Sequence, residues 1–128
     1  MAKMVGVWIF VHPRKVTDSA KLTVGGTIIM SQAEVRKLGV GLLPISIRVR
    51  DEDWLFDDNV QNDNSFFFAA HQVGPNSFTT DVTIPHSKLV DSEPSSESVT
   101  ELYARVRGVS ASVSTDWADS QTEDVRYE

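Results

Sequence analysis

Short apolar runs rich in β-branched and aromatic residues recur along the chain and predict β-strands. The first run, VGVWIFV at 5–11, is nearly continuous and predicts a buried strand that ends at Pro13, because proline has no N–H for strand pairing. The second, LTVGGTIIM at 22–30, contains Gly25 and Gly26, and this pair predicts a bulge or sharp bend within a strand.

A short helix is predicted after the second strand. Ser31 and Glu34 have the spacing of a capping box, and Gly39 suits a C-terminal cap. The pattern therefore predicts a helix of about two turns over Gln32–Leu38. Because the crossover of a parallel βαβ unit takes a dozen or so residues, the helix argues against a doubly wound α/β fold.

The remaining strands are predicted by alternation and by turn residues. Apolar and polar residues alternate with period 2 over 45–50, which indicates a strand with one solvated face. Strands at 66–73 and 78–84 are separated by the sequence Gly-Pro-Asn-Ser at 74–77, which predicts a hairpin. In the last strand region, 99–114, the apolar positions change face at Gly108, so a bulge or a break is expected there.

Six or seven strands with one short helix predict an all-β fold, an antiparallel β-sandwich or, as the alternative, an open barrel, and we expect the sandwich. Its length of 128 residues fits one domain, which we place at 1–115 and follow with an acidic C-terminal tail at 116–128. Trp117 is expected to hold the start of that tail.

Composition excludes several classes of function. A net charge of −6 argues against general nucleic-acid binding, which needs a basic surface. The chain has no cysteine, so disulfides, thiol nucleophiles and cysteine-ligated zinc are excluded. It shows no signal peptide and no apolar run near the roughly 20 residues that span a bilayer. A cytoplasmic protein, or a domain excised from a larger one, is expected.

One local basic feature stands against the acidic total. Four arginines alternate along two predicted strands and would form a cationic stripe if those strands were neighbours: Arg48, Arg50, Arg105 and Arg107. The alternative, which we favour, is that they mark the solvated face of a sheet and pair with nearby carboxylates.

The segment 51–63 is the most distinctive chemical feature, because carboxylates and carboxamides dominate it. It begins where the strand 45–50 ends, so a rigid element holds its first carboxylates. Ca²⁺ accepts carboxylate, amide and main-chain oxygens in loose geometry, which such a loop supplies. The candidate ligands for Ca²⁺ are Asp51, Asp53, Asp57 and Asp58.

The acidic segment is not an EF-hand, because Phe56 occupies the position of the invariant glycine when positions are counted from Asp51. Two alternatives to a cation site remain open. The segment is a solvated loop whose Asp and Asn residues favour turns, or it recognises a partner by charge.

Trp54 and Asp63 are the candidate partner-binding residues of this segment. An exposed tryptophan beside a calcium loop stacks on a sugar ring or inserts at a membrane interface. The alternative is that Trp54 folds back with Leu55 and Phe56 to close one end of the sandwich, because three exposed apolar side chains would promote association.

The segment 45–53, with Asp57 and Asp58 after it, resembles the strand that leads into the third calcium loop of C2 domains. There, too, a strand delivers Asp-x-Asp and a later aspartate. The same stretch is similar to the Asp-Glu-Asp…Asp-Asp segment of transthyretin-like β-sandwich domains. Over 45–68, the resemblance implies a sandwich in which Asp51 and Asp53 bind Ca²⁺, together with Asp57 or Asp58.

Catalytic signatures are weak. His12, His71 and His86 lack the paired spacing of metal ligands, and we expect ordinary structural histidines. The leading hypothesis is a non-enzymatic binding module that uses the 51–63 loop, with Ca²⁺, to bind a protein partner. The second is a structural protein that forms homo-oligomers through its sheet edges, with the acidic loop only solvated. An enzyme built on carboxylates and histidines ranks last.

Overall fold

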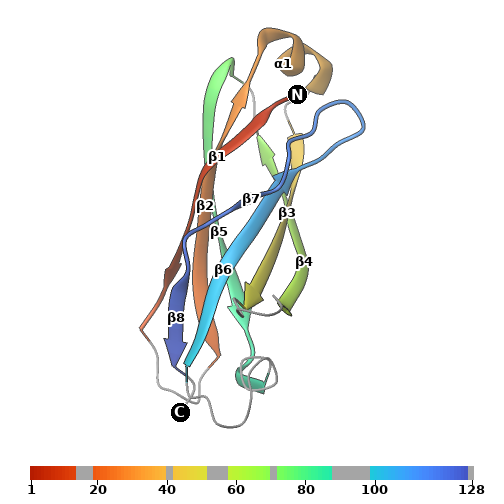
Figure 1. Ribbon diagram of the computed structural model, residues 1–128. Coiled ribbons are helices and arrows are strands. Elements are labelled where there is room, and N and C mark those ends of the chain that lie inside the picture. Colours follow the sequence, from red (N-terminus) through yellow and green to blue (C-terminus); the bar gives the residue numbers. More distant parts are fainter. Residues whose placement is uncertain (14–18, 40–41, 52–57, 70–71, 88–98, 127–128) are drawn as a thin grey trace.

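A computed structural model describes residues 1–13, 19–39, 42–51, 58–69, 72–87 and 99–126. The chain forms a tall sandwich of two β-sheets, with the helix α1 at the end where the N-terminus lies (Figure 1). The elements, in chain order, are β1 (Lys3–Val11), β2 (Ala20–Met30), α1 (Gln32–Leu38), β3 (Leu42–Asp51), β4 (Asp58–Ala69), β5 (Gly74–Ile84), β6 (Val99–Gly108), β7 (Ala118–Asp119) and β8 (Glu123–Arg126).

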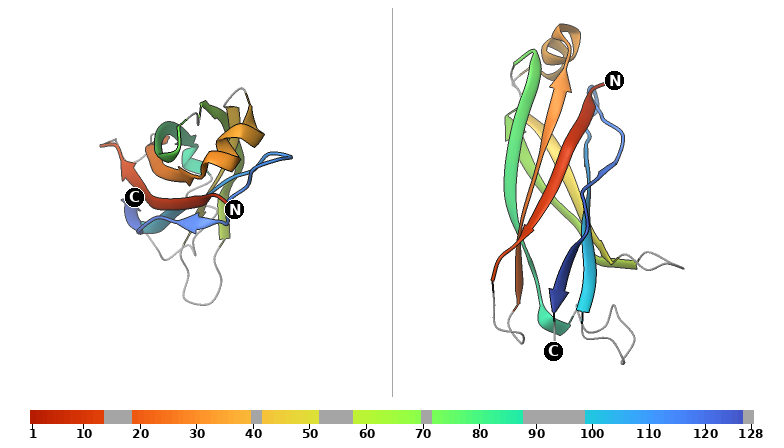
Figure 2. Two further views of the ribbon diagram at one scale, coloured as in Figure 1. Left: turned by 90° about the horizontal axis from the view of Figure 1, so that it is seen from above. Right: turned by 60° about the vertical axis from the view of Figure 1, so that its left-hand side comes forward.

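The strands pair antiparallel throughout the two sheets. One sheet, called sheet A, has the order β1-β2-β5; the other, sheet B, has the order β4-β3-β6-β7, and β8 also pairs with β6. Figure 2 shows the two layers from above and from the side. The predicted antiparallel β-sandwich with a short helix is confirmed.

The core lies between the sheets and follows the alternation of each strand. In β3, the residues Leu43, Ile45, Ile47 and Val49 are at most 1% exposed, whereas the residues between them are partly exposed. Leu22, Val24 and Ile28 of β2 face them from the other sheet and are fully buried. Each such side chain contributes about 1.5–3 kcal/mol by leaving water, so this layer is the main source of stability.

The predicted hairpin at 74–77 is wrong. These four residues begin β5, which pairs with β2 in sheet A, whereas β4 belongs to sheet B. The chain therefore changes sheets before Gly74. Asn76 fixes this corner: its buried side chain donates to the Gln72 carbonyl at 2.9 Å and accepts from the Gln72 N–H at 3.2 Å. A glycine, a proline and an asparagine together mark a corner between sheets here, not a turn within one.

The bulge predicted at Gly25 and Gly26 lies on the neighbouring strand. β2 pairs with β5 without interruption through both glycines, and the register shifts instead in β1, between Val5 and Trp8. Gly6 has φ of +59° there, a left-handed conformation that glycine adopts at little cost. The missing side chain at Gly25 makes room for a neighbour, because a Cβ there would stand 2.3 Å from two carbons of the Trp8 ring.

The last predicted strand is interrupted at the expected residue. β6 ends at Gly108, and a single bridge between Val109 and Ser114 follows, so the predicted break is confirmed while 109–114 is not a strand. The segment 116–128, expected to be a tail, contributes β7 and β8 to sheet B. Asp119, Glu123 and Asp124 of this segment sit on strands whose main-chain partners are in β6, which composition does not reveal.

The helix matches its predicted bounds and cap. The Ser31 hydroxyl accepts from the Glu34 N–H at 3.2 Å, and the Glu34 carboxylate accepts from the Ser31 N–H at 2.8 Å. This second bond is the main reason that the pKa of Glu34 is lowered from its ordinary value. The N-terminal amine of Met1, 3.7 Å away, acts in the same direction.

Gly108 is required by packing, and we expect Gly108→Val to lower the free energy of unfolding by about 1–3 kcal/mol, the usual cost of overpacking. A Cβ at this position would stand 2.8 Å from Cδ2 of Leu43. Chemical denaturation measures the loss. In a Leu43→Ala background the same substitution should cost less, because the opposing side chain is gone; an equal cost in both backgrounds contradicts this packing account.

Candidate functional site

The acidic segment is held by a hairpin between β3 and β4, at the end of the sandwich away from α1 (Figure 1). Asp51, the last residue of β3, is directly opposite Asp58, the first residue of β4. Residues 58–63 are therefore strand, so the loop predicted at 51–63 is shorter than expected. The register brings the two acidic arms of the segment to adjacent main-chain positions.

Asp51 differs from the solvated loop residue that acidic composition favours. It continues the inward series of β3 and is only 1% exposed. Carboxylates at such low exposure are held by specific interactions, since burial without them is expensive. Asp51 is thus the last member of the buried row of β3.

The structure describes two of the other predicted site residues, Asp58 and Asp63. Asp58 and Asp63 lie in β4, on the same strand. Asp53, Trp54 and Asp57 lie outside the described residues. Among the residues that the structure describes, no group of three or more histidine, aspartate and glutamate side chains is placed to hold a metal ion.

The cationic stripe is formed as the alternation suggested. β3 and β6 are neighbours, and their register places Arg48 opposite Arg105, Ser46 opposite Arg107 and Arg50 opposite Tyr103. All four arginines are partly exposed on the outer face of sheet B. Like charges directly opposite one another on a sheet are destabilising, so this face needs a compensating partner.

Trp117 is one such partner. Its ring lies 4.7 Å from the guanidinium carbon of Arg48 and 4.5 Å from that of Arg107, with Arg105 at 5.9 Å. Arg105 also lies 3.6 Å from a carboxylate oxygen of Asp119. These cation–π contacts fasten the chain just before β7 across the outside of sheet B. The arginine stripe therefore has a structural role, because it binds the ring of Trp117. Trp117 holds the start of the segment 116–128, as expected.

The outer face of sheet A carries residues that sequence reasoning missed. The run 5–11 was expected to be buried on both sides, yet Val5, Trp8 and Phe10 are 38%, 39% and 52% exposed. The sequence does contain a signal of this exposure. Gly6 shifts the alternation of inward and outward positions, and Ile9 separates Trp8 from Phe10. A continuous apolar run masks such an alternation.

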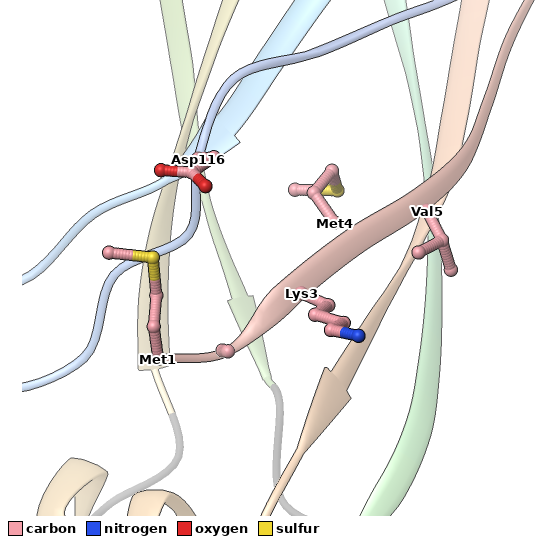
Figure 3. A pocket seen from close by; sticks show the side chains of 6 residues that line it. Met1, Lys3, Met4, Val5 and Asp116 are labelled. Atoms are coloured by element: carbon pink, nitrogen blue, oxygen red, sulfur yellow. The ribbon is translucent and has the colours of Figure 1, made fainter.

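A pocket of about 230 Å³ opens at the N-terminus, lined by residues 1–5 and Asp116. Figure 3 shows the side chains of Met1 and Met4 near Asp116, with the ammonium of Lys3 turned away from that carboxylate. Its lining is mainly apolar and offers one carboxylate, which is too little for acid–base chemistry between paired groups.

Neither the scan against protein-family models nor the search of curated proteins gave a match to this chain.

None of the helices in the described part of the chain has the length and apolar character needed to cross a membrane.

Replacing Trp117 should test the structural role of the arginine stack. We expect Trp117→Leu to lower the free energy of unfolding by about 1–3 kcal/mol, since up to three cation–π contacts of about 0.5–1 kcal/mol each are lost. Trp117→Phe should retain part of that stability. The matched control is Asp119→Asn, which removes one half-exposed ion pair worth about 0–1 kcal/mol. Denaturant melts in which Trp117→Leu costs no more than Asp119→Asn would argue against the stack.

Proposed function

We propose that this protein is a non-enzymatic β-sandwich binding module that binds a protein partner through the acidic hairpin end, with Ca²⁺ as its cation. The observation that carries the proposal is the pairing of Asp51 with Asp58 across β3 and β4. Two aspartates at opposed positions, with Glu52, Asp53 and Asp57 between them in sequence, concentrate negative charge that a divalent cation would neutralise.

The burial of Asp51 supports this proposal over a loop that serves only solubility. A residue recruited for solubility is expected in water, whereas Asp51 is 1% exposed. The resemblance of 45–68 to the strand and third calcium loop of C2 domains points the same way. In this proposal Asp51 and Asp58 anchor the two arms, Asp53 and Asp57 supply further oxygens, and Trp54 and Asp63 contact the partner.

The cation part of the proposal is tested by adding Ca²⁺ to the full chain. A ligand that binds only the folded state adds about 2.7 kcal/mol of stability when its free concentration is about 100 times Kd, so the melting temperature should rise. Calorimetric titration should show a matching heat. The variant Asp53→Asn/Asp57→Asn, which spares the buried Asp51, should lose both signals.

The control variant is Asp119→Asn/Glu123→Gln, which removes the same charge from β7 and β8 and should bind Ca²⁺ like the unmodified chain. If neither heat nor a melting shift appears at millimolar Ca²⁺, the hairpin does not bind this cation. A shift that survives Asp53→Asn/Asp57→Asn places binding elsewhere.

Assembly through a sheet edge is the second candidate function, because β5 forms an outer strand of sheet A. This strand has 11 residues, and among the described residues it pairs only with β2. A long outer strand offers main-chain groups to a second copy. Antiparallel pairing of two β5 strands would join two three-stranded sheets into one.

Light scattering after size-exclusion chromatography tests this second candidate. Edge pairing predicts a species of twice the 14.2 kDa chain mass that becomes more abundant as concentration rises. A monomer at every concentration contradicts assembly through this edge.

A further inference from the structure

The outer face of sheet A combines exposed aromatic rings with an ordered row of polar groups. Trp8 and Phe10 lie on β1 and His12 follows directly after its end, with one inward-facing or partly buried residue between each two. Thr23 of β2 is opposite Phe10, and Asp81 of β5 is opposite Thr23. We call this surface the aromatic–hydroxyl face; its members are Trp8, Phe10, His12, Lys21, Thr23 and Asp81.

The Trp8 ring packs directly on the sheet because Gly25 beneath it has no side chain. Its ring lies so close to Gly25 that a Cβ there would be 2.3 Å from Cε2 and from Cζ2. Trp8 as a whole residue is nevertheless 39% exposed, so part of it is available to a ligand. A ring placed on a strand and supported by main chain loses little freedom when a ligand binds, which favours affinity.

The polar groups beside the rings form one connected row. The Thr23 hydroxyl lies 2.7 Å from Nε2 of His12 and donates to Asp81 at 2.8 Å. The Thr23 bond is the main cause that lowers the pKa of Asp81, so this carboxylate is an ionised acceptor at neutral pH. Lys21 lies 3.7 Å from the other oxygen of Asp81. Phe10 meets His12 edge to face at 5.0 Å, so the aromatic and polar rows touch.

Within the six members of the aromatic–hydroxyl face, the charges of Lys21 and Asp81 offset each other although the whole chain carries −6, and Lys3 lies farther along the same side of sheet A. Lys21 and Asp81 form an ion pair between diagonal positions of β2 and β5, and other outward positions of these strands hold hydroxyls, with Thr27 and Ser77 only 3.1 Å apart. A neutral surface does not attract a charged polymer. It complements a neutral ligand that has both C–H faces and many hydroxyl groups.

We propose that the aromatic–hydroxyl face binds a neutral oligosaccharide. The C–H face of one sugar ring would lie on Trp8 and that of the next on Phe10, whose positions on the strand are about 7 Å apart. Ring hydroxyls would donate to Asp81 and accept from Lys21. This proposal is independent of the acidic hairpin, because it uses other strands on the other sheet.

A second copy of the chain is the main competing occupant of this face. It would cover the same aromatics, but it would also have to desolvate the row from His12 to Asp81, whose remaining hydrogen-bonding capacity a flat protein surface satisfies poorly. Sugar hydroxyls provide donors and acceptors at every ring and satisfy such groups more readily.

The experiment is a titration of the full chain with neutral hexasaccharides built from glucose, mannose, galactose or xylose, followed by NMR. At about 10 mM ligand, even a Kd of about 1 mM fills most sites. The indole N–H signal of Trp8, assigned with Trp8→Phe, should move with at least one member of the panel. Phe10→Ala and Asp81→Asn should each weaken binding about tenfold, because stacking and a charge-assisted bond are lost.

Phe10 and Asp81 are exposed, so these two variants test binding without removing core packing. The controls are Leu42→Ala, an exposed apolar residue of sheet B, and Asp53→Asn/Asp57→Asn; both should bind the sugar normally. No shift with any hexasaccharide overturns the proposal, as does binding that Phe10→Ala and Asp81→Asn leave unchanged. A concentration-dependent dimer that Phe10→Ala abolishes would assign the face to a second copy.

Discussion

Burial of alternate side chains between two sheets is the constraint on which the rest of this protein depends. Leu43, Ile45, Ile47 and Val49 face the interior from one sheet, and Leu22, Val24 and Ile28 face it from the other. Because side chains on a strand alternate, fixing the inward set also fixes the outward set. The arginines of sheet B and the aromatic rings of sheet A are displayed on opposite outer faces for this reason, on strands that cannot slip by one residue.

At two places a glycine within a strand lets a neighbouring side chain pack directly against the main chain. At Gly25 the sheet surface accepts the ring of Trp8, and at Gly108 the end of β6 accepts Leu43. The first arrangement serves the surface and the second serves the core. Both show that a glycine within a strand can mark close packing rather than a bend, and the one bulge of sheet A lies instead at Gly6 on β1.

The two proposed sites differ in charge, and we therefore expect them to bind different kinds of ligand. The hairpin end places Asp51 opposite Asp58, so the binding proposed there should depend on divalent ions. At the aromatic–hydroxyl face the charges of Lys21 and Asp81 offset each other, so the sugar binding proposed there should be insensitive to those ions. Trp117 belongs to neither site: its contacts with three arginines fasten the chain ahead of β7 to sheet B.

Local patterning in the sequence determined the class of fold, the bounds and cap of α1, the alternation of β3 and the end of β6 at Gly108, because each depends on residues near in sequence. Which strands pair was decided only by the tertiary structure. The residues from Gly74 to Ser77 look like a hairpin but begin β5, which pairs with β2 along its whole length, whereas β4 pairs with β3. The burial of Asp51, the exposure of Trp8 and Phe10, and the row from His12 to Asp81 likewise arise from residues up to 69 positions apart. No local pattern encodes contacts that the packing of two sheets creates.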